Sequence, residues 1–311
     1  MGIMHVVVGA TGATGSVLVR ELLRRGEKVR AVNRSGRVGL PDVELNGVEF
    51  IRANASDADQ MTEICAGATA VYHCVRPPLP EWLELYPRVQ QALISAAGTA
   101  GAVLVFADDT WMYGRVDRPM TEDMPYRPVA HLGLIRAWLA EMTLAAHHRG
   151  DVRVAIARAG ELYGPKVESL FGSTMFAGKR PIWFGDPDLP ITPTYIDDFA
   201  TTMITLAGEP DAWGEVWHVP SSEPTTARRF AELAGRAAVR AMPTTAAKAL
   251  GLVSTVARHG NQVLYQFEQP FIVDSTRFTS QFGGTASDLR EGIAASLRWH
   301  RQNPRRSLLP S

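Results

Sequence analysis

The sequence is poor in cysteine. Only Cys65 and Cys74 occur among 311 residues, and both stand in apolar surroundings. They are too few and too closely placed for the disulfide framework of a secreted domain or for a zinc site. We therefore predict no metal site, and a reducing cytoplasm is the default expectation.

The sequence also lacks long apolar runs. No stretch approaches the roughly 18 to 20 apolar residues that a membrane span requires, and the apolar run at residues 3–8 is too short for the core of a signal peptide. We expect a protein without a membrane span or an export signal. Neither an internal repeat nor a low-complexity segment precedes the polar tail at residues 301–311.

An excess of charge of either sign is absent as well. Lys plus Arg and Asp plus Glu number 32 each, so no overall field attracts nucleic acid or an anionic membrane surface. This balance favours a small-molecule substrate as the partner.

What the sequence does contain is a regular alternation of apolar patterns. Residues 4–8 are continuous and rich in valine, as in a strand buried on both faces, and residues 13–25 carry apolar side chains at helical spacing. The pattern continues with expected strands at 28–33, 48–52, 70–75, 102–106 and 152–158, and expected helices at 57–65, 81–100 and 131–149. Such alternation predicts an α/β fold with a doubly wound parallel Rossmann sheet.

The regularity breaks after Gly160. Glycine and proline crowd residues 163–193, and a later helix is expected at 226–242. We expect residues 1–160 to form the nucleotide-binding Rossmann domain, with 194–218 returning to it. Residues 161–193 and 219–311 then form a small α+β substrate-binding lobe, which a chain of 311 residues is long enough to carry.

A glycine-rich segment joins the first expected strand to the first expected helix. A bound pyrophosphate must be met by backbone N–H groups and a helix N-terminus, which requires a turn without obstructing side chains. The strand before the segment and the helix after it make the motif specific for a dinucleotide. The predicted phosphate-binding residues are Gly9, Thr11, Gly12, Ala13, Thr14 and Gly15.

The end of the second expected strand reads the ribose of the cofactor. An acidic residue there would accept hydrogen bonds from the 2′-hydroxyl of NAD, but this sequence has Asn33 and Arg34. A carboxylate would repel a 2′-phosphate, whereas a guanidinium binds it with paired, charged hydrogen bonds. NADP(H) is therefore the predicted cofactor; the alternative is that Arg34 and Arg37 belong to a solvated basic loop.

Further motifs extend this pattern along the chain. They are Asn54-Ala55-Ser56-Asp57, Tyr72-His73-Cys74-Val75, Met112-Tyr113-Gly114, Arg158 with Tyr163-Gly164-Pro165, and Tyr195-Ile196-Asp197-Asp198. With them the chain resembles the extended short-chain dehydrogenase/reductase family, in its NAD-dependent epimerase/dehydratase group, over almost its whole length. The resemblance implies that Asn54 and Ala55 bound the adenine, and that Cys74 and Val75 flank its ribose. It also implies a homodimer through the helices at 81–100 and 131–149.

This sequence has other residue types at the positions that carry out proton transfer in that family. The family uses a Ser or Thr, a Tyr, and a Lys four residues after the Tyr. Its Ser-Ser pair falls on Asp108-Asp109, the Tyr on Leu132 and the Lys on Arg136. A shift of one residue would put His131 at the tyrosine position, but it would lose the matching glycine and the cation.

The proton donor must therefore be found elsewhere. Asp109 is the first candidate, because a carboxyl beside a nicotinamide in an apolar crevice has its pKa raised and can donate a proton; the alternative is a carboxylate that caps the next turn. His131 is the second candidate, or else a helix cap or surface residue. Arg136 cannot act as an acid. The resemblance implies that it holds the nicotinamide ribose, as the family's Lys does; the alternative is a surface arginine.

Substrate contacts are expected near the same strand ends. The candidates are Asp108, Tyr113, Glu161 and Trp183, and apolar surface for a pocket is offered by Phe171, Met175, Phe184 and an expected helix at 253–267. For each of these the alternative is a place in the core.

Three functions remain open from the sequence. The leading one is an NADPH-dependent reductase of a carbonyl or imine group on a small, apolar metabolite, with an atypical proton donor. The second is an epimerase, isomerase or dehydratase that uses bound NADP. The third is a non-catalytic NADP-binding sensor, which the loss of the Ser and Tyr suggests.

Overall fold

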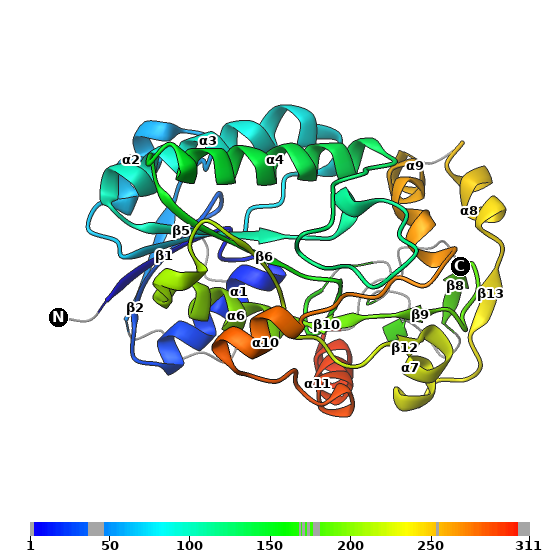
Figure 1. Ribbon diagram of the computed structural model, residues 1–311. Helices are drawn as coiled ribbons and strands as arrows, with labels where there is room; N and C mark the ends of the chain where they lie inside the picture. Colours follow the sequence, from blue (N-terminus) through cyan, green and yellow to red (C-terminus); the bar gives the residue numbers. More distant parts are fainter. Residues whose placement is uncertain are drawn as a thin grey trace.

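A seven-stranded parallel sheet forms the centre of the fold (Figure 1). The computed structural model describes residues 3–36, 47–167, 169, 172, 175–176, 181–252 and 255–303, so Arg37 and Phe171 lie outside the described residues. The sheet consists of β1 (Met4–Val8), β2 (Lys28–Asn33), β3 (Val48–Arg52), β4 (Ala70–His73), β5 (Val103–Asp108), β6 (Arg153–Arg158) and β11 (Val216–His218). Their order is β11-β6-β5-β4-β1-β2-β3, which confirms the predicted doubly wound Rossmann fold.

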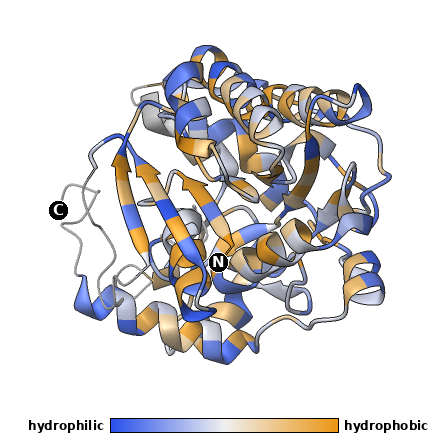
Figure 2. Ribbon diagram, turned by 90° about the vertical axis from the view of Figure 1, so that its left-hand side faces the viewer, coloured by the Kyte–Doolittle hydropathy of each residue, from blue (hydrophilic) through white to orange (hydrophobic). Residues whose placement is uncertain are grey.

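The sheet is buried on both faces because its strands are apolar at successive positions. Val7 packs in one cluster with Leu18, whereas Val6 packs in another with Leu93 on the opposite face. Figure 2 shows the mainly hydrophobic strands enclosed between helical layers. The strand order reverses between β1 and β4, and this reversal is where ligands bind in folds of this type.

Helices cover both faces of the sheet. One layer contains α2 (Ala58–Cys65), α3 (Trp82–Ala100) and α4 (His131–His148), and the other contains α1 (Ala13–Arg24) and α6 (Ile196–Gly208) (Figure 1). The expected helices at 13–25, 57–65, 81–100 and 131–149 are thus confirmed to within one residue at either end. No described helix is long and apolar enough to cross a membrane.

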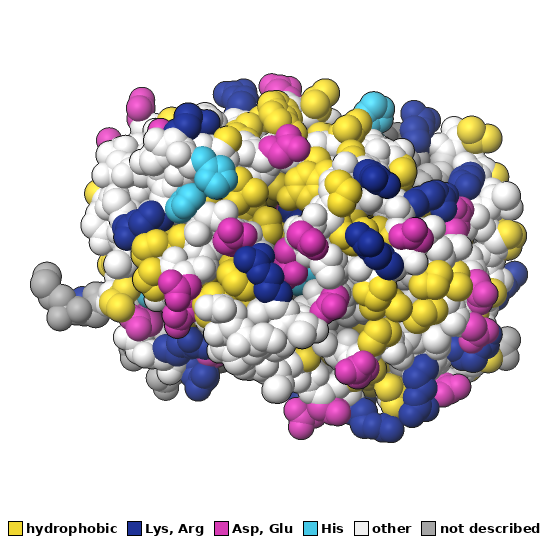
Figure 3. Space-filling view, viewed as in Figure 1, with side chains coloured by type: hydrophobic (Ala, Val, Ile, Leu, Met, Phe, Trp, Pro, Cys, Tyr) yellow, Lys and Arg dark blue, Asp and Glu magenta, His cyan; other side chains and the backbone are white. Residues whose placement is uncertain are grey.

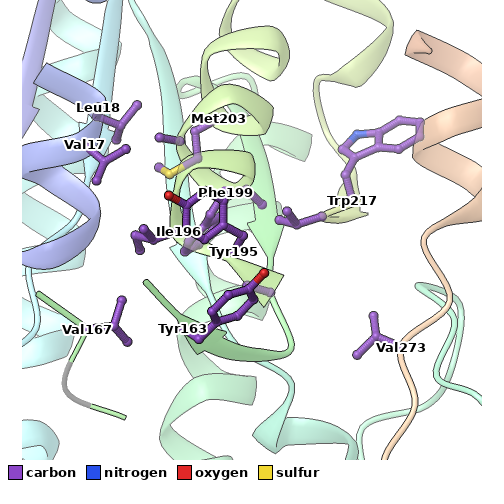
Figure 4. Packing of buried hydrophobic residues seen from close by; sticks show 14 of the residues in the cluster. Val17, Leu18, Tyr163, Val167, Tyr195, Ile196, Phe199, Met203, Trp217 and Val273 are labelled. Atoms are coloured by element: carbon purple, nitrogen blue, oxygen red, sulfur yellow. The ribbon is translucent and has the colours of Figure 1, made fainter. Parts of the chain in front are cut away.

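Residues 194–218 contribute to this central unit. Figure 4 shows Ile196, Phe199 and Met203 of α6 beside Val17 and Leu18 of α1, and β11 pairs in parallel with β6. The division of the chain into a nucleotide domain and a substrate lobe stays a prediction.

The rest of the chain forms small two-stranded sheets and short helices. The sheets pair β7 (Glu161–Tyr163) with β10 (Pro193–Tyr195), β9 (Pro190–Ile191) with β12 (Thr225–Thr226), and β8 (Ile182–Phe184) with β13 (Arg240–Met242). The described helices there are α7 (Ala227–Leu233), α8 (Thr244–Leu250), α9 (Thr255–Gly260), α10 (Thr276–Phe282) and α11 (Leu289–Gln302), with the 3₁₀ turn η4 (Asn261–Phe267). The 3₁₀ turns η1 (Leu79–Glu81), η2 (Trp111–Tyr113) and η3 (Pro210–Ala212) lie in the central unit.

Two of the expected helices are wrong in this part. The helix expected at 226–242 ends at Leu233, because Gly235 adopts a positive φ of 63° and the chain then enters β13. The single helix expected at 253–267 is divided, within its described residues, into α9 and the 3₁₀ turn η4. Apolar spacing alone did not reveal these interruptions, since pairing of β13 with β8 is a tertiary contact.

Candidate nucleotide and substrate site

A cavity of about 560 Å³ lies where the strand order reverses. The glycine loop between β1 and α1 lines it together with residues that follow β2, β3 and β4. Because the carboxyl ends of parallel strands meet at one edge of the sheet, these loops converge although they are far apart in the sequence.

The three glycines of the loop have different structural roles. Gly9 has a φ of 89°, and a Cβ there would lie 2.6 Å from the carbonyl oxygen of Cys74. A Cβ on Gly15 would overlap the carbonyl oxygen of Gly9. On Gly12, which lines the cavity, a Cβ meets only the Gly9 carbonyl oxygen, at 3.3 Å. Gly9 thus permits the turn, Gly15 permits close packing, and Gly12 leaves room for a bound group.

Most of the predicted cofactor-binding residues come together in this cavity. Its lining includes Gly9, Thr11, Gly12, Ala13, Thr14, Asn33, Arg34, Asn54, Ala55, Cys74 and Val75. Gly15 is not part of the lining and packs against the loop backbone instead. Ser56, which belongs to the motif quoted above, lines the cavity as well. The sequence did not indicate Arg76, Pro77, Pro78, Leu162, Lys166, Val167 and Ser169 as lining residues. The position of Arg76, shortly after the end of β4, is the feature of the sequence that could have indicated its place in the cavity.

Asn33 and Arg34 differ in what they offer to a ligand. Asn33 is 7% exposed, and its Oδ1 accepts hydrogen bonds from the Ser35 N–H (3.0 Å), the Ser35 hydroxyl (2.8 Å) and the Gly36 N–H (2.7 Å). Arg34, in contrast, is exposed at the rim of the cavity. The oxygen of Asn33 is therefore engaged in shaping the turn, and the guanidinium of Arg34 is the accessible group.

A buried cluster of charges stands at the end of β5. The Asp108 side chain is fully buried, and its Oδ2 accepts from Nε of Arg158 at 2.9 Å. Its Oδ1 pairs with Nη2 of Arg136 at 2.5 Å. Arg136 also donates to the Tyr86 hydroxyl (2.8 Å) and to the Ala107 carbonyl oxygen (2.9 Å). Both guanidiniums are thereby held in the interior.

Asp109 is the member of this cluster that reaches the surface. A quarter of its side chain is exposed, and its Oδ2 lies 3.1 Å from Nε of Arg136. Its Oδ1 accepts from the Trp111 N–H at 3.0 Å, which is the turn-capping contact that the sequence left open. Burial raises the pKa of the Asp109 carboxyl, and the charge of Arg136 partly offsets this.

The other candidates for proton transfer and cofactor contact lie in different surroundings. His131 is exposed at the first residue of α4, and Leu132 beside it is buried. Arg136 is 3% exposed, so the alternative of a surface arginine is wrong. Arg136 contacts Asp108 and Asp109, and its contact with a nicotinamide ribose stays a prediction.

Asp108 and Tyr113 belong to the interior rather than to a substrate surface. The Tyr113 hydroxyl accepts from Nη1 of Arg158 (2.7 Å) and donates to Nε2 of His218 (2.8 Å), whose Nδ1–H donates to the Asp274 carbonyl oxygen. Burial raises the pKa of Tyr113 to about 12 and lowers that of His218 to about 3. The substrate contacts predicted for Asp108 and Tyr113 have no exposed polar group to act through, so we do not retain them.

The remaining predicted substrate residues lie in the small sheets and their core. Trp183 is 3% exposed and packs edge-on against Phe267, with ring centroids 4.7 Å apart. Met175 is buried as well, whereas Glu161 and Phe184 are half-buried on β7 and β8. For Trp183 and Met175 the structure thus favours the core alternative.

The different work of the glycines can be tested with a matched pair of variants. We expect Gly12→Ala to keep the melting temperature and to lower the affinity for NADP(H), because its methyl group enters the cavity. Gly15→Ala should lower the melting temperature, because its methyl group overlaps the Gly9 backbone. Thermal unfolding and titration calorimetry measure both. Equal melting temperatures and equal affinities in the two variants would contradict the assignment.

Comparison with known proteins places these features in a family. The model of the NAD dependent epimerase/dehydratase family matches residues 5–219. A dTDP-glucose 4,6-dehydratase of Streptomyces niveus is 23% identical, over 96% of this chain and 93% of that protein. A 2-alkyl-3-oxoalkanoate reductase of Stenotrophomonas maltophilia (strain K279a) is 26% identical, over 72% of each chain.

Solved structures share the fold over nearly the whole chain. MoeE5 in complex with UDP-glucose and NAD superposes with a TM-score of 0.75 at 24% identity, covering 97% of this chain and 99% of that one. UDP-glucuronic acid 4-epimerase from Bacillus cereus in complex with NAD gives 0.77 at 17% identity, covering 97% and 100%. Since the family model spans well over half of the sequence, the protein belongs to the NAD dependent epimerase/dehydratase family.

Proposed function

We propose that the protein is an enzyme that binds NADP(H) and converts a small-molecule substrate by an epimerase or dehydratase type of reaction, with Asp109 as the proton-transfer group. The carrying observation is the partly exposed carboxyl of Asp109, held by Arg136 at the end of β5. The sequence alone favoured a reductase. Family membership and the dehydratase relative support the epimerase or dehydratase alternative better, and the relative that is named a reductase keeps reduction as the second candidate.

The cavity fits a nicotinamide dinucleotide. The N–H groups of the loop around Gly12 and the N-terminus of α1 suit the pyrophosphate, and Arg34 suits a 2′-phosphate. The bound cofactor supplies reversible hydride exchange with a substrate carbon. NADP is preferred in this proposal because the oxygen of Asn33 is engaged by its own turn, whereas Arg34 is exposed at the rim of the cavity.

Asp109 does the proton transfer in this proposal. The phenol that the family uses is replaced by Leu132, which is 3% exposed and has no titratable group. The Asp109 carboxylate takes a proton from a substrate hydroxyl and later returns it, while Arg136 stays charged and fixes the carboxylate. A raised pKa suits this exchange, since it makes the carboxylate a stronger base than an ordinary aspartate.

A homodimer through α3 and α4 is part of the proposal. Leu134 and Trp138 are 52% and 47% exposed one turn apart on α4, and Leu83 at the start of α3 is 72% exposed. Large apolar side chains that share an exposed helix face are typical of an interface.

The role of Asp109 predicts a specific kinetic result. Asp109→Asn should lower kcat about 10²- to 10⁴-fold, because the amide cannot exchange the proton. In the wild type, kcat/KM should rise with pH through the raised pKa of Asp109, since the carboxylate is the reactive form. His131→Phe, at an exposed position, should leave turnover unchanged.

The assay uses a panel of nucleotide sugars and small carbonyl compounds, with product analysis and the absorbance of the reduced nicotinamide. An epimerase or dehydratase forms product without net change in that absorbance, whereas a reductase consumes NADPH stoichiometrically. Tight binding of NADP(H) with no turnover across the panel would instead favour the sensor. Loss of activity in His131→Phe but not in Asp109→Asn would overturn the assignment of Asp109.

The cofactor preference is tested at Arg34. Arg34→Ala should weaken binding of NADP(H) by about tenfold or more and leave binding of NAD(H) nearly unchanged, because only the 2′-phosphate loses a partner. Calorimetric titration of both nucleotides gives the comparison. An equal loss for the two nucleotides would show that Arg34 does not read the 2′-phosphate.

The interface is tested at Trp138. Trp138→Lys should convert the dimer to a monomer in sedimentation experiments, because it places a charge in an apolar contact. Leu252→Lys is the matched control, since Leu252 is 79% exposed outside α3 and α4 and its replacement should leave the dimer intact. A monomeric wild type would refute the proposed interface.

A further inference from the structure

Lys166 has an unusual backbone conformation. Its φ is 65°, and among the described residues it is the only one with a side chain and a positive φ. Residues with a Cβ rarely adopt this left-handed conformation, and those that do cluster at functional sites. The structure around Lys166 must therefore hold the segment in place.

The segment before Lys166 is anchored on both sides. Tyr163 packs at a tilt against Tyr195 with ring centroids 5.3 Å apart, and β7 pairs in parallel with β10. A Cβ on Gly164 would overlap the side chain of Ile196, so the chain passes close to the start of α6. This packing fixes the turn from which Lys166 extends.

Lys166 lines the same cavity as the glycine loop. Its neighbours Leu162 and Val167 also line the cavity, so this segment and the loop enclose one space. Val167 and Tyr163 belong to the same buried hydrophobic cluster as the α1 residues Val17 and Leu18 (Figure 4). The ammonium group of Lys166 is half-buried, and burial lowers its pKa below the usual value for lysine.

The charge of the cavity is of one sign. Its described lining residues include the cations Arg34, Arg76 and Lys166 and no carboxylate. Figure 3 shows that basic and acidic side chains are interspersed over one face of the molecule, so a lining with cations alone differs from that surface. The three cations follow β2, β4 and β7, respectively, and Arg34 is the one assigned to a 2′-phosphate.

We propose that Lys166 binds a diphosphate, completing with its ammonium group the anion site that the backbone N–H groups of the glycine loop begin. This inference rests on the proposed nucleotide site and adds to it a side chain from a separate segment. The diphosphate is that of the dinucleotide or that of a nucleotide-linked substrate, since both carry the same group. A lysine suits it because its ammonium is a compact point charge with three donors.

The test measures binding rather than turnover. Lys166→Met should weaken binding of ADP-ribose, NAD and NADP by about tenfold each if the dinucleotide supplies the diphosphate. If a nucleotide-linked substrate supplies it, the variant should lose affinity for UDP and keep its affinity for the dinucleotides. Affinity for AMP and NMN, which carry no diphosphate, should change less in either case.

Three controls separate charge from fold. Lys166→Asn removes the charge but suits a positive φ, so it should show the same loss of affinity as Lys166→Met without destabilising the turn. Lys166→Arg should retain most of the affinity. Lys28→Met neutralises an exposed lysine at the opposite end of a sheet strand and should change no affinity.

Unchanged affinity for ADP-ribose, NAD, NADP and UDP in a folded Lys166→Met would overturn the inference. That failure differs from failure of the proposed function, since a wild type that binds neither NAD nor NADP would refute the nucleotide site itself. If Arg34→Ala loses only NADP while Lys166→Met loses nothing, the nucleotide site stands and the role of Lys166 is wrong.

Discussion

The site depends on the carboxylate of Asp108, which two arginines share. Asp108 ends β5 and lies opposite Arg158 in the register of β5 and β6, and all three side chains are nearly excluded from solvent. Removing one partner of a buried ion pair typically costs about 3–5 kcal/mol, because the remaining charge stays desolvated. On one side of Asp108, Arg136 forms ion pairs with Asp108 and Asp109 and a hydrogen bond with Tyr86. On the other side, Arg158 donates hydrogen bonds to the hydroxyls of Tyr113 and Tyr126, and these bonds fix the segment between β5 and α4.

This arrangement explains why a carboxylate pair and an arginine occur together. An arginine at position 136 keeps its charge even when buried, and its planar fork contacts Asp108 and Asp109 at the same time. Each carboxylate oxygen of Asp108 pairs with one of the two arginines. Among the described residues, Asp109 forms an ion pair with Arg136, and a quarter of its side chain is exposed. Because both oxygens of Asp108 are held by arginines, we assign the proposed proton transfer to Asp109.

Local patterns predicted the central sheet and the glycine loop, because continuous valine-rich strands and the spacing of Gly9, Gly12 and Gly15 act through nearby residues. The sequence identified Asp108, Asp109 and Arg136 as candidates but not their mutual contacts, since these join β5 to α4. In the sequence Arg158 is only part of a motif, and its bond to Asp108 depends on strand register. Lys166 gave no local signal. The role proposed for it rests on a backbone angle and a shared cavity, both of which exist only in the folded chain.

The end of β2 shows how one short turn constrains the cofactor. If the amide oxygen of Asn33 faced the cavity, it would accept a hydrogen bond from a ribose hydroxyl and favour neither nucleotide strongly. Instead it accepts from three donors of Ser35 and Gly36, which closes the turn and leaves Arg34 as the exposed group at the rim. The hydrogen bonds of this turn thus occupy the Asn33 oxygen as an acceptor and leave the Arg34 guanidinium exposed. In the proposed site, discrimination between the two nucleotides rests on this turn.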